Sequence, residues 1–223
     1  MDLHRSTVNV LAVGAHCDDV ELGCGATLAK HVAAGDHVSI LHLSAGVGSR
    51  EWPEEPSLAA VHARCVCARR AAVHLGAHRI DFADFPDQRF DVVPFLDIVK
   101  AIEEMPIPNV VYSHHQGDLN LDHAITARAV LTAFRPCAVG ANIYAFEVLS
   151  STEWGAGFEP TMFVGIDGDP WLRKLAALRD YADEIPEHSH PRSIAAVDAL
   201  SRSRGASVGL QRAEAFVTVR QFA

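Results

Sequence analysis

The fold of this chain is decided by the segment Val8-Asn9-Val10-Leu11-Ala12-Val13-Gly14 and by the helical pattern that follows it. The segment is short, rich in β-branched residues and ended by glycine, which is typical of a buried β-strand. The residues from Val20 to Ala34 then have the pattern of a helix that Gly35 closes. A strand that leads directly into a helix is the first half of a β-α-β unit.

The alternation of strand and helix continues along the chain. We predict strands at His37–Leu43, Arg79–Phe82, Asn109–Ser113, Ile143–Val148 and Met162–Ile166. We predict helices at Leu58–Leu75, Val92–Met105, Asp122–Phe134 and Trp171–Tyr181, and one more after the loop Pro186–Pro191. Such units pack as a mostly parallel sheet with helices on both faces. We therefore expect an α/β, Rossmann-like, doubly wound fold, with residues 1–223 in a single domain.

Composition and charge narrow the function classes. Of the 223 residues, 49% are hydrophobic and 21% charged, as in a soluble globular domain. The net charge of −9 repels phosphate backbones, so we expect no nucleic-acid partner, although a local arginine can still bind a small phosphorylated substrate.

The sequence predicts a cytoplasmic protein. No segment approaches the ~18 apolar residues of a membrane span, and the first residues lack the apolar stretch of a signal peptide. The five cysteines are odd in number and lack CxxC spacing, which indicates reduced thiols.

Two polar clusters each follow a predicted strand directly. One is Ala15-His16-Cys17-Asp18-Asp19-Val20-Glu21, and the other runs from His114 to His123. In open parallel sheets, ligands bind beyond the carboxyl ends of the strands, near a switch in strand order. A strand order of 3-2-1-4 makes the two clusters face each other across one crevice.

The residue types in these clusters indicate a metal hydrolase. His16, Asp19 and His123 are suitable zinc ligands, and three protein ligands with one open position are typical of catalytic zinc. The open position holds a water whose pKa falls toward ~7 on the metal. Asp18 is then a candidate general base for that water.

Structural explanations of the same residues stay open at this point. An aspartate before a helix is usually an N-cap, which would account for Asp18 and Asp122. His114 and His115 could be exposed residues at a strand end. The coincidence of two histidine and carboxylate clusters at strand ends favours the metal site.

The chain resembles the PIG-L/LmbE-like deacetylases. The resemblance is carried by Gly14–Leu28, which is similar to the family's AH(P)DD element with its Gly-x-Gly helix start. It continues at Leu43–Gly46, at Arg64 with Ala71 and Leu75-Gly76, at Asp122-His123, and from Arg204-Gly205 to Phe216. The family implies zinc-dependent removal of N-acetyl groups from N-acetylglucosamine units on lipids, thiol precursors, antibiotics or nucleotide sugars.

The resemblance also implies roles for residues. His16, Asp19 and His123 would bind zinc or another divalent transition metal, and Asp18 would be the base. Arg64 would lie near the substrate, with a helix-surface salt bridge as the alternative. Relatives are often trimers or hexamers, so the resemblance implies a homo-oligomer.

Two positions depart from the family pattern. Cys17 replaces the signature proline, and Asn120 replaces a histidine that in relatives assists the oxyanion or the leaving group. An amide can donate a hydrogen bond to an oxyanion but cannot deliver a proton. The general acid is therefore sought among Asp18, His115, and the late pair His188 and His190.

The segment Pro186–Ser193 is polar and rich in histidine. We interpret it as a flap over the crevice, with His188, His190 and Arg192 facing the substrate and Arg192 holding an anionic group. The alternative is a solvated loop in which Pro191 begins a helix.

Together, these observations predict a zinc-dependent N-deacetylase that acts on an N-acetylated amino sugar. A zinc-bound water would attack the amide with Asp18 as the base. One rival is a related zinc amidase acting on a larger acyl or thiol conjugate. Another is a non-hydrolytic nucleotide-binding Rossmann protein, suggested by Gly23 and Gly25, although acidic residues stand where such a protein needs a phosphate-binding loop.

Overall fold

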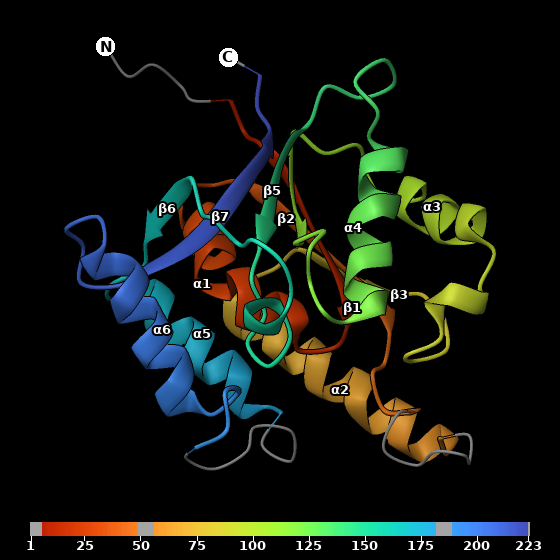
Figure 1. The fold of residues 1–223 in the computed structure, drawn as a ribbon, viewed down its shortest axis with the longest axis horizontal. Coiled ribbons are helices and arrows are strands. Elements are labelled where there is room, and N and C mark those ends of the chain that lie inside the picture. Colours follow the sequence, from red (N-terminus) through yellow and green to blue (C-terminus); the bar gives the residue numbers. More distant parts are fainter. Residues whose placement is uncertain (1–5, 49–55, 182–188, 223) are drawn as a thin grey trace.

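The computed structural model describes residues 6–48, 56–181 and 189–222. They form a seven-stranded sheet in the order β3-β2-β1-β4-β5-β7-β6 (Figure 1). The strands are β1 (Asn9–His16), β2 (His37–Ser44), β3 (Arg79–Phe82), β4 (Val110–His114), β5 (Asn142–Phe146), β6 (Met162–Gly165) and β7 (Ala213–Arg220).

The first five strands run parallel, and only the β7 pairings are antiparallel. Pairing is parallel from β3 through β2, β1 and β4 to β5, whereas β7 runs antiparallel to both β5 and β6. Both the mostly parallel sheet and the predicted 3-2-1-4 order are confirmed. The carboxyl ends of β1 and β4 therefore lie side by side, because the chain turns from β1 toward β2 on one side and crosses to β4 on the other.

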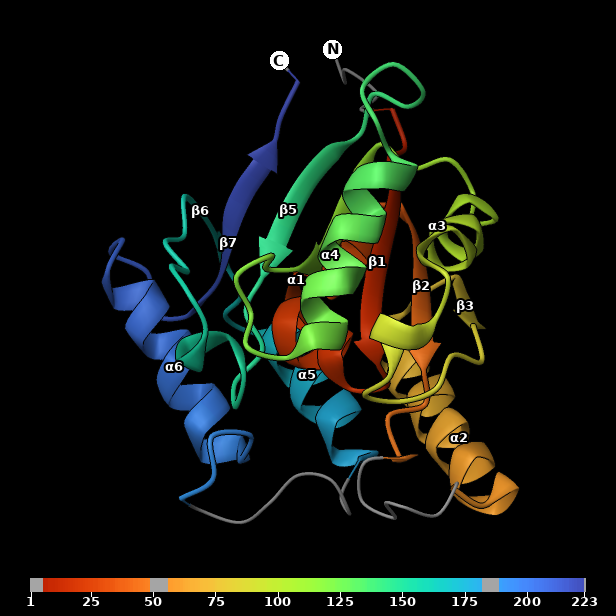
Figure 2. The same cartoon turned by 45° about the vertical axis from the view of Figure 1, so that its right-hand side comes forward.

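Helices cover both faces of the sheet (Figures 1 and 2). They are α1 (Asp19–Ala33), α2 (Leu58–Leu75), α3 (Phe95–Glu103), α4 (Leu121–Ala133), α5 (Asp169–Arg179) and α6 (Ile194–Ala206), with short 3-10 turns η2 (Phe90–Val92) and η3 (Thr152–Trp154). The doubly wound α/β fold is confirmed. No helix in the described ranges is both long and apolar enough to cross a lipid bilayer.

Alternate residues of β1 belong to two separate cores. Val10 and Ala12 pack with α1, α2 and α5, while Leu11 and Val13 pack with α3 and α4. This follows from the period of two along a strand, which sends successive side chains to opposite faces. Because β1 is buried on both faces, its sequence is a nearly continuous apolar run.

One predicted helix is shorter than the sequence pattern indicated. The segment Val92–Met105 was expected to be helical throughout, but α3 begins only at Phe95, after Pro94 at its N-cap position. Val93, which precedes the proline, is extended, with ψ of 135°. Proline excludes the residue before it from helical geometry, which accounts for the late start.

Candidate metal centre

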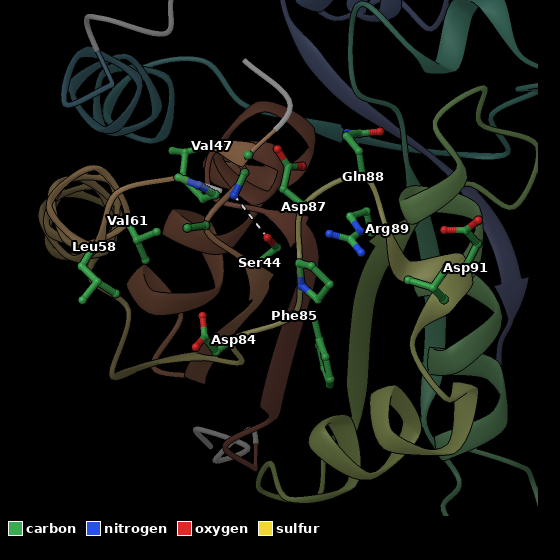
Figure 3. A pocket seen from close by; sticks show the side chains of 16 residues that line it. Ser44, Val47, Leu58, Val61, Asp84, Phe85, Asp87, Gln88, Arg89 and Asp91 are labelled. Carbon is green, nitrogen blue, oxygen red and sulfur yellow. Dashed lines mark hydrogen bonds between the residues drawn. The ribbon is translucent and has the colours of Figure 1, made fainter. Parts of the chain in front are cut away.

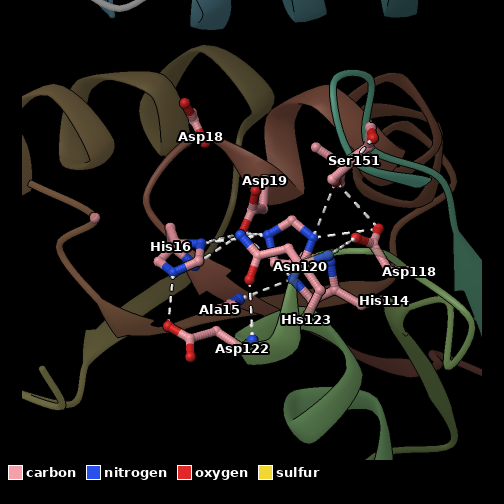
Figure 4. Close-up of polar contacts among 12 residues, drawn as sticks. Ala15, His16, Asp18, Asp19, His114, Asp118, Asn120, Asp122, His123 and Ser151 are labelled. Atoms are coloured by element: carbon pink, nitrogen blue, oxygen red, sulfur yellow. Dashed lines mark hydrogen bonds and ion pairs between the residues drawn. The ribbon is translucent and has the colours of Figure 1, made fainter. Parts of the chain in front are cut away.

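Three buried side chains converge where β1 and β4 end (Figure 4). His16 ends β1, Asp19 begins α1, and His123 lies in the first turn of α4. Asp19 Oδ2 lies 3.3 Å from His16 Nδ1 and 3.3 Å from His123 Nε2, and the two ring nitrogens are also 3.3 Å apart. Residues 107 positions apart thus present three donor atoms to one point.

The donor set fits a zinc-type ion. In a tetrahedron, edges of 3.3 Å correspond to a centre-to-corner distance of about 2.0 Å, the length of a zinc–nitrogen bond. Two imidazoles and one carboxylate are the ligand types of catalytic zinc. In addition, Asp19 Oδ1 is buried with no hydrogen-bond partner among the described residues, as expected of a ligand group awaiting a cation.

A carboxylate contacts each imidazole at the ring nitrogen that does not belong to the triangle. Asp122 Oδ2 lies 3.1 Å from His16 Nε2, and Asp118 Oδ2 lies 3.2 Å from His123 Nδ1. Each carboxylate can accept the N–H of the far ring nitrogen, which leaves the lone pair of the near nitrogen free for a metal. Asp118 is itself fixed by the hydroxyl of Thr152, which donates to it at 2.5 Å.

The electrostatics of the two imidazoles are also consistent with a cation site. Burial opposes a charge on His16, but Asp122, Asp19 and Asp87 outweigh it, so the pKa of His16 lies well above its usual value. Burial likewise opposes a charge on His123, and Asp19 and Asp118 raise its pKa. The carboxylates around both rings therefore favour positive charge at this site, as a binding site for a dication requires.

His114 is buried in the same cluster, and with Asp118 and His123 it forms a second group of side chains that could hold a metal ion. Its Nε2 accepts a hydrogen bond from the Ala15 backbone amide at 2.9 Å, which occupies the lone pair that faces Asp19. Burial lowers the pKa of His114 to about 4, in keeping with a neutral acceptor ring. The interpretation of His114 as an exposed strand-end residue is wrong: it is 2% exposed.

Asp18 lies beside the triad of His16, Asp19 and His123 but is not part of it (Figure 4). Its backbone is in the left-handed region, with φ of 106°, and its side chain makes no capping bond to α1, so the N-cap explanation for its side chain is wrong. Its carboxylate instead faces Arg192, whose Nη1 lies 3.5 Å away. Burial raises the pKa of Asp18, and the charge of Arg192 counters that rise.

Asn120, and not Asp122, caps helix α4. The Asn120 side-chain oxygen accepts a hydrogen bond from the Asp122 backbone amide at 2.9 Å. The N-cap explanation for Asp122 is therefore wrong, because its carboxylate contacts His16 Nε2 and accepts a hydrogen bond from the Phe90 backbone amide. Capping also orients the Asn120 amide: with its oxygen committed to the helix, its NH2 group is left to donate elsewhere.

A polar cavity of about 110 Å³ opens beside the triad. Its walls include five of the predicted site residues: His16, Asp18, Arg64, Asn120 and Arg192. Arg64 is only 6% exposed. The alternative of a salt bridge on the exposed surface of α2 therefore does not fit this residue. Arg192 reaches in from the residues before α6, and its Nε donates to Ser150 Oγ at 2.7 Å.

Neither His115 nor His190 lines this cavity. His115 Nδ1 accepts a hydrogen bond from the Gly117 amide, and its ring packs edge-on against Phe158. His190 is exposed and accepts a hydrogen bond from the Arg192 amide. His188 lies outside the described residues, together with Pro186 and Glu187 of the predicted flap.

Sequence reasoning missed Asp87, Asp118 and Ser151. Asp87 Oδ1 lies 3.1 Å from His16 Nε2, and Ser151 Oγ lies 3.3 Å from His123 Nδ1. Asp87 follows β3 and Ser151 follows β5, at the same edge of the sheet as the triad. The strand-end rule that located His16 would also have suggested these two loops.

Comparison with known proteins identifies the family. The model of the GlcNAc-PI de-N-acetylase (PIG-L) family matches residues 11–134, which contain all three converging ligands. The chain belongs to the PIG-L family. It is 29% identical over 180 residues to the deacetylase YaiS of Escherichia coli (strain K12), a protein described as uncharacterized, and the match covers 77% of this chain and 89% of the relative.

Solved structures share the fold of this chain over most of its length. The conserved protein TT1542 from Thermus thermophilus is 25% identical with a TM-score of 0.76, and 97% of each chain is covered. The N,N'-diacetylchitobiose deacetylase from Pyrococcus horikoshii is 18% identical with a TM-score of 0.75, covering 95% of this chain and 83% of that one. At 18% identity, the second likeness concerns the fold alone.

Gly23, the first glycine of the Gly23-x-Gly25 pair, has a packing role in the fold. A Cβ placed on Gly23 would lie 2.3 Å from the Phe146 ring, so glycine lets α1 approach β5 closely. The helix start, where a phosphate-binding loop would stand, carries Asp18 and Asp19. The nucleotide-binding alternative therefore has no support from this part of the chain.

Proposed function

We propose that the protein is a zinc-dependent hydrolase that removes the N-acetyl group from an N-acetylglucosamine-type sugar or sugar conjugate. The observation that carries this proposal is the 3.3 Å triangle of His16, Asp19 and His123, with Asp18 beside it in the same polar cavity. Membership of the PIG-L family supports the deacetylase chemistry.

The ligands and the base take separate roles in this proposal. His16, Asp19 and His123 would hold the ion, which when bound lowers the pKa of a coordinated water toward ~7 and polarises the amide carbonyl. Asp18 accepts a proton from the attacking water. Asp18 lines the same polar cavity as His16 and makes no capping bond to α1, so its carboxylate is available for proton transfer.

The oxyanion and the leaving amine need their own partners. The NH2 group of Asn120, oriented by the cap, donates a hydrogen bond to the oxyanion that forms from the acetyl carbonyl. Asp18 then returns its proton to the departing nitrogen as the carbon–nitrogen bond breaks, which yields acetate and a free amino sugar. His115 and His190 do not line the cavity, so Asp18 is the simplest acid among the described residues.

A coupled acetate-release assay tests the proposal. Purified protein would be incubated with N-acetylglucosamine, its glycosides and nucleotide sugars, before and after removal of metal by a chelator, and again after zinc is restored. Acetate release that chelation abolishes and zinc restores supports the proposal. If no acetylated sugar is hydrolysed but longer N-acyl conjugates are, the related amidase replaces it.

A further inference from the structure

A second and larger cavity lies next to the metal centre (Figure 3). It has a volume of about 660 Å³ and is formed by the residues after β2, the start of α2 and the loop after β3. In Figure 3, Val47, Leu58 and Val61 lie across the opening from Asp87, Gln88 and Arg89. A volume of this size is in the range of small-molecule binding pockets, roughly 300–1,000 Å³.

The two cavities are adjacent and share part of their walls. Gly46, Asp87 and Gln88 line both the large cavity and the polar cavity of the metal centre. Asp87 also contacts His16, with Asp87 Oδ1 3.1 Å from His16 Nε2. A substrate whose amide lies at the triad can therefore extend into the large cavity without leaving the protein surface.

The walls of the large cavity favour an apolar occupant. Its apolar side chains are Val47, Leu58, Val61, Phe85, Pro86 and Val92. Leu58 is 87% exposed and Val92 is 64% exposed, so a ligand that covers them removes apolar surface from water. Large apolar side chains gathered at the mouth of a pocket are typical of a binding surface.

Charge in the large cavity disfavours an anion. The described lining residues include three aspartates, Asp84, Asp87 and Asp91, against one arginine, Arg89. A phosphate or diphosphate would enter a locally negative site on a protein whose net charge is already −9. Two further arginines, Arg64 and Arg192, line the polar cavity and not the large one.

We propose that the large cavity binds the apolar aglycone, an alkyl or aryl group, of the acetylated amino sugar that the metal centre hydrolyses. This inference rests on the proposed function and narrows its substrate class to uncharged, amphiphilic glycosides. The aglycone is remote from the reacting amide, so it contributes equally to substrate and transition-state binding. It therefore lowers KM and leaves kcat unchanged.

The test compares glycosides that differ only in the aglycone. Acetate release would be measured for the methyl and octyl glycosides of N-acetylglucosamine, below the micelle concentration of the latter, and for a nucleotide diphosphate sugar. Each methylene removed from water is worth about fourfold in binding, so we expect kcat/KM to rise at least about tenfold from methyl to octyl, through KM. The nucleotide sugar should be the poorest of the three.

Matched variants on one helix locate the effect. Leu58→Asp changes a lining side chain that is already 87% exposed, and it should reduce the octyl-to-methyl ratio to near one. Val73→Asp, on the same helix and 76% exposed but absent from the cavity lining, should keep the ratio of the unchanged protein. Circular dichroism of both variants confirms that the comparison is between folded proteins.

The outcomes separate this inference from the proposed function. Equal kcat/KM for the two glycosides, a preference for the nucleotide sugar, or an octyl preference that survives Leu58→Asp would each overturn the inference while leaving a working deacetylase. Failure to release acetate from any of the three would overturn the proposed function, and the inference with it.

Discussion

The carboxylate of Asp122 lies 3.1 Å from His16 Nε2, on the side of the ring opposite the nitrogen that faces Asp19 and His123. Both groups are buried, with side-chain exposures of 2% and 8%. Because the imidazole N–H can be donated to Asp122, the carboxylate fixes the ring orientation and increases the basicity of the metal-facing nitrogen. It thus ties the start of α4 to the end of β1.

Asp122→Asn should weaken zinc binding without unfolding the protein. Asparagine keeps an oxygen for the Phe90 amide but removes the charge that polarises His16, and loss of such a partner typically costs 10–100-fold in metal affinity. Competition with a chromophoric chelator measures the affinity. Asp97→Asn, an exposed carboxylate on α3, is the matched control. Equal zinc affinities for the two variants would refute the role of Asp122.

The residues that sequence reasoning located share one property. His16, Asp19 and His123 lie where a strand ends or a helix starts, so the rule that ligands bind at the carboxyl edge of a parallel sheet was enough to find them. The strand order around β1 followed from the same β-α-β pattern. Both inferences depend on the periodicity of hydrophobic residues and on the alternation of strands and helices. A single sequence contains both kinds of information.

The residues that were missed depend on side-chain direction. His114 and His115 are neighbours on the chain, but His114 is buried beside Asp19, whereas the half-buried ring of His115 packs edge-on against Phe158. A local sequence does not reveal which of the two points inward. Asp118 was likewise missed because its contact with His123 depends on how the 114–120 loop folds back.

The last strand was missed for a different reason. In β7, Ala213–Arg220, burial changes from complete at Ala213–Phe216 to partial beyond, so the strand lacks a clear alternating pattern. It is also antiparallel, at the point where the β-α-β rhythm has ended. Glu214 within it is buried and charged, which is uncommon for a strand interior and weakens the strand signal further.

Asp18→Asn should abolish most turnover and keep the metal. The substitution preserves shape but removes the proton acceptor, and general-base catalysis typically contributes 10²–10⁴-fold to the rate. Zinc content, measured by atomic absorption on the purified variant, should equal that of the unchanged protein. A variant that loses zinc in parallel with activity would make Asp18 a ligand and contradict the division of roles.

Arg192→Gln should shift the pH dependence of catalysis. Burial raises the pKa of Asp18 and the Arg192 charge lowers it, so removal of the guanidinium raises the pKa further. Asp18 must be deprotonated to act as base, and the acid limb of the kcat/KM profile therefore moves to higher pH. The loss of activity should be greatest at low pH and smaller at high pH.

A matched substitution controls for general effects of charge. Arg202→Gln removes an arginine that pairs with Asp198 at 2.7 Å on the outer part of α6, well away from the cavity lining. Its kcat/KM profile should overlay that of the unchanged protein. An acid limb that stays in place in Arg192→Gln would show that Arg192 does not act on the base.

A buried ion pair between α5 and β7 supports the helix that carries Asp19. Lys174 Nζ donates to Glu214 Oε1 and to the Leu22 carbonyl, both at 2.6 Å, and Glu214 accepts the Ala26 and Thr27 amides at 3.1 and 2.7 Å. Lys174 is 3% exposed and Glu214 is 5% exposed. Lys174→Met leaves the carboxylate buried without its counter-charge, which should cost about 3–5 kcal/mol of unfolding free energy.

Urea unfolding at neutral pH measures that loss, and a second substitution tests its cause. Lys174→Met combined with Glu214→Gln removes the charge but keeps an oxygen for the α1 amides, so the double variant should be more stable than Lys174→Met alone. If the double variant were instead the less stable of the two, the unpaired charge of Glu214 would not be the cause of the lost stability. The cause would then be the lost packing of Lys174 and its lost hydrogen bond to the Leu22 carbonyl.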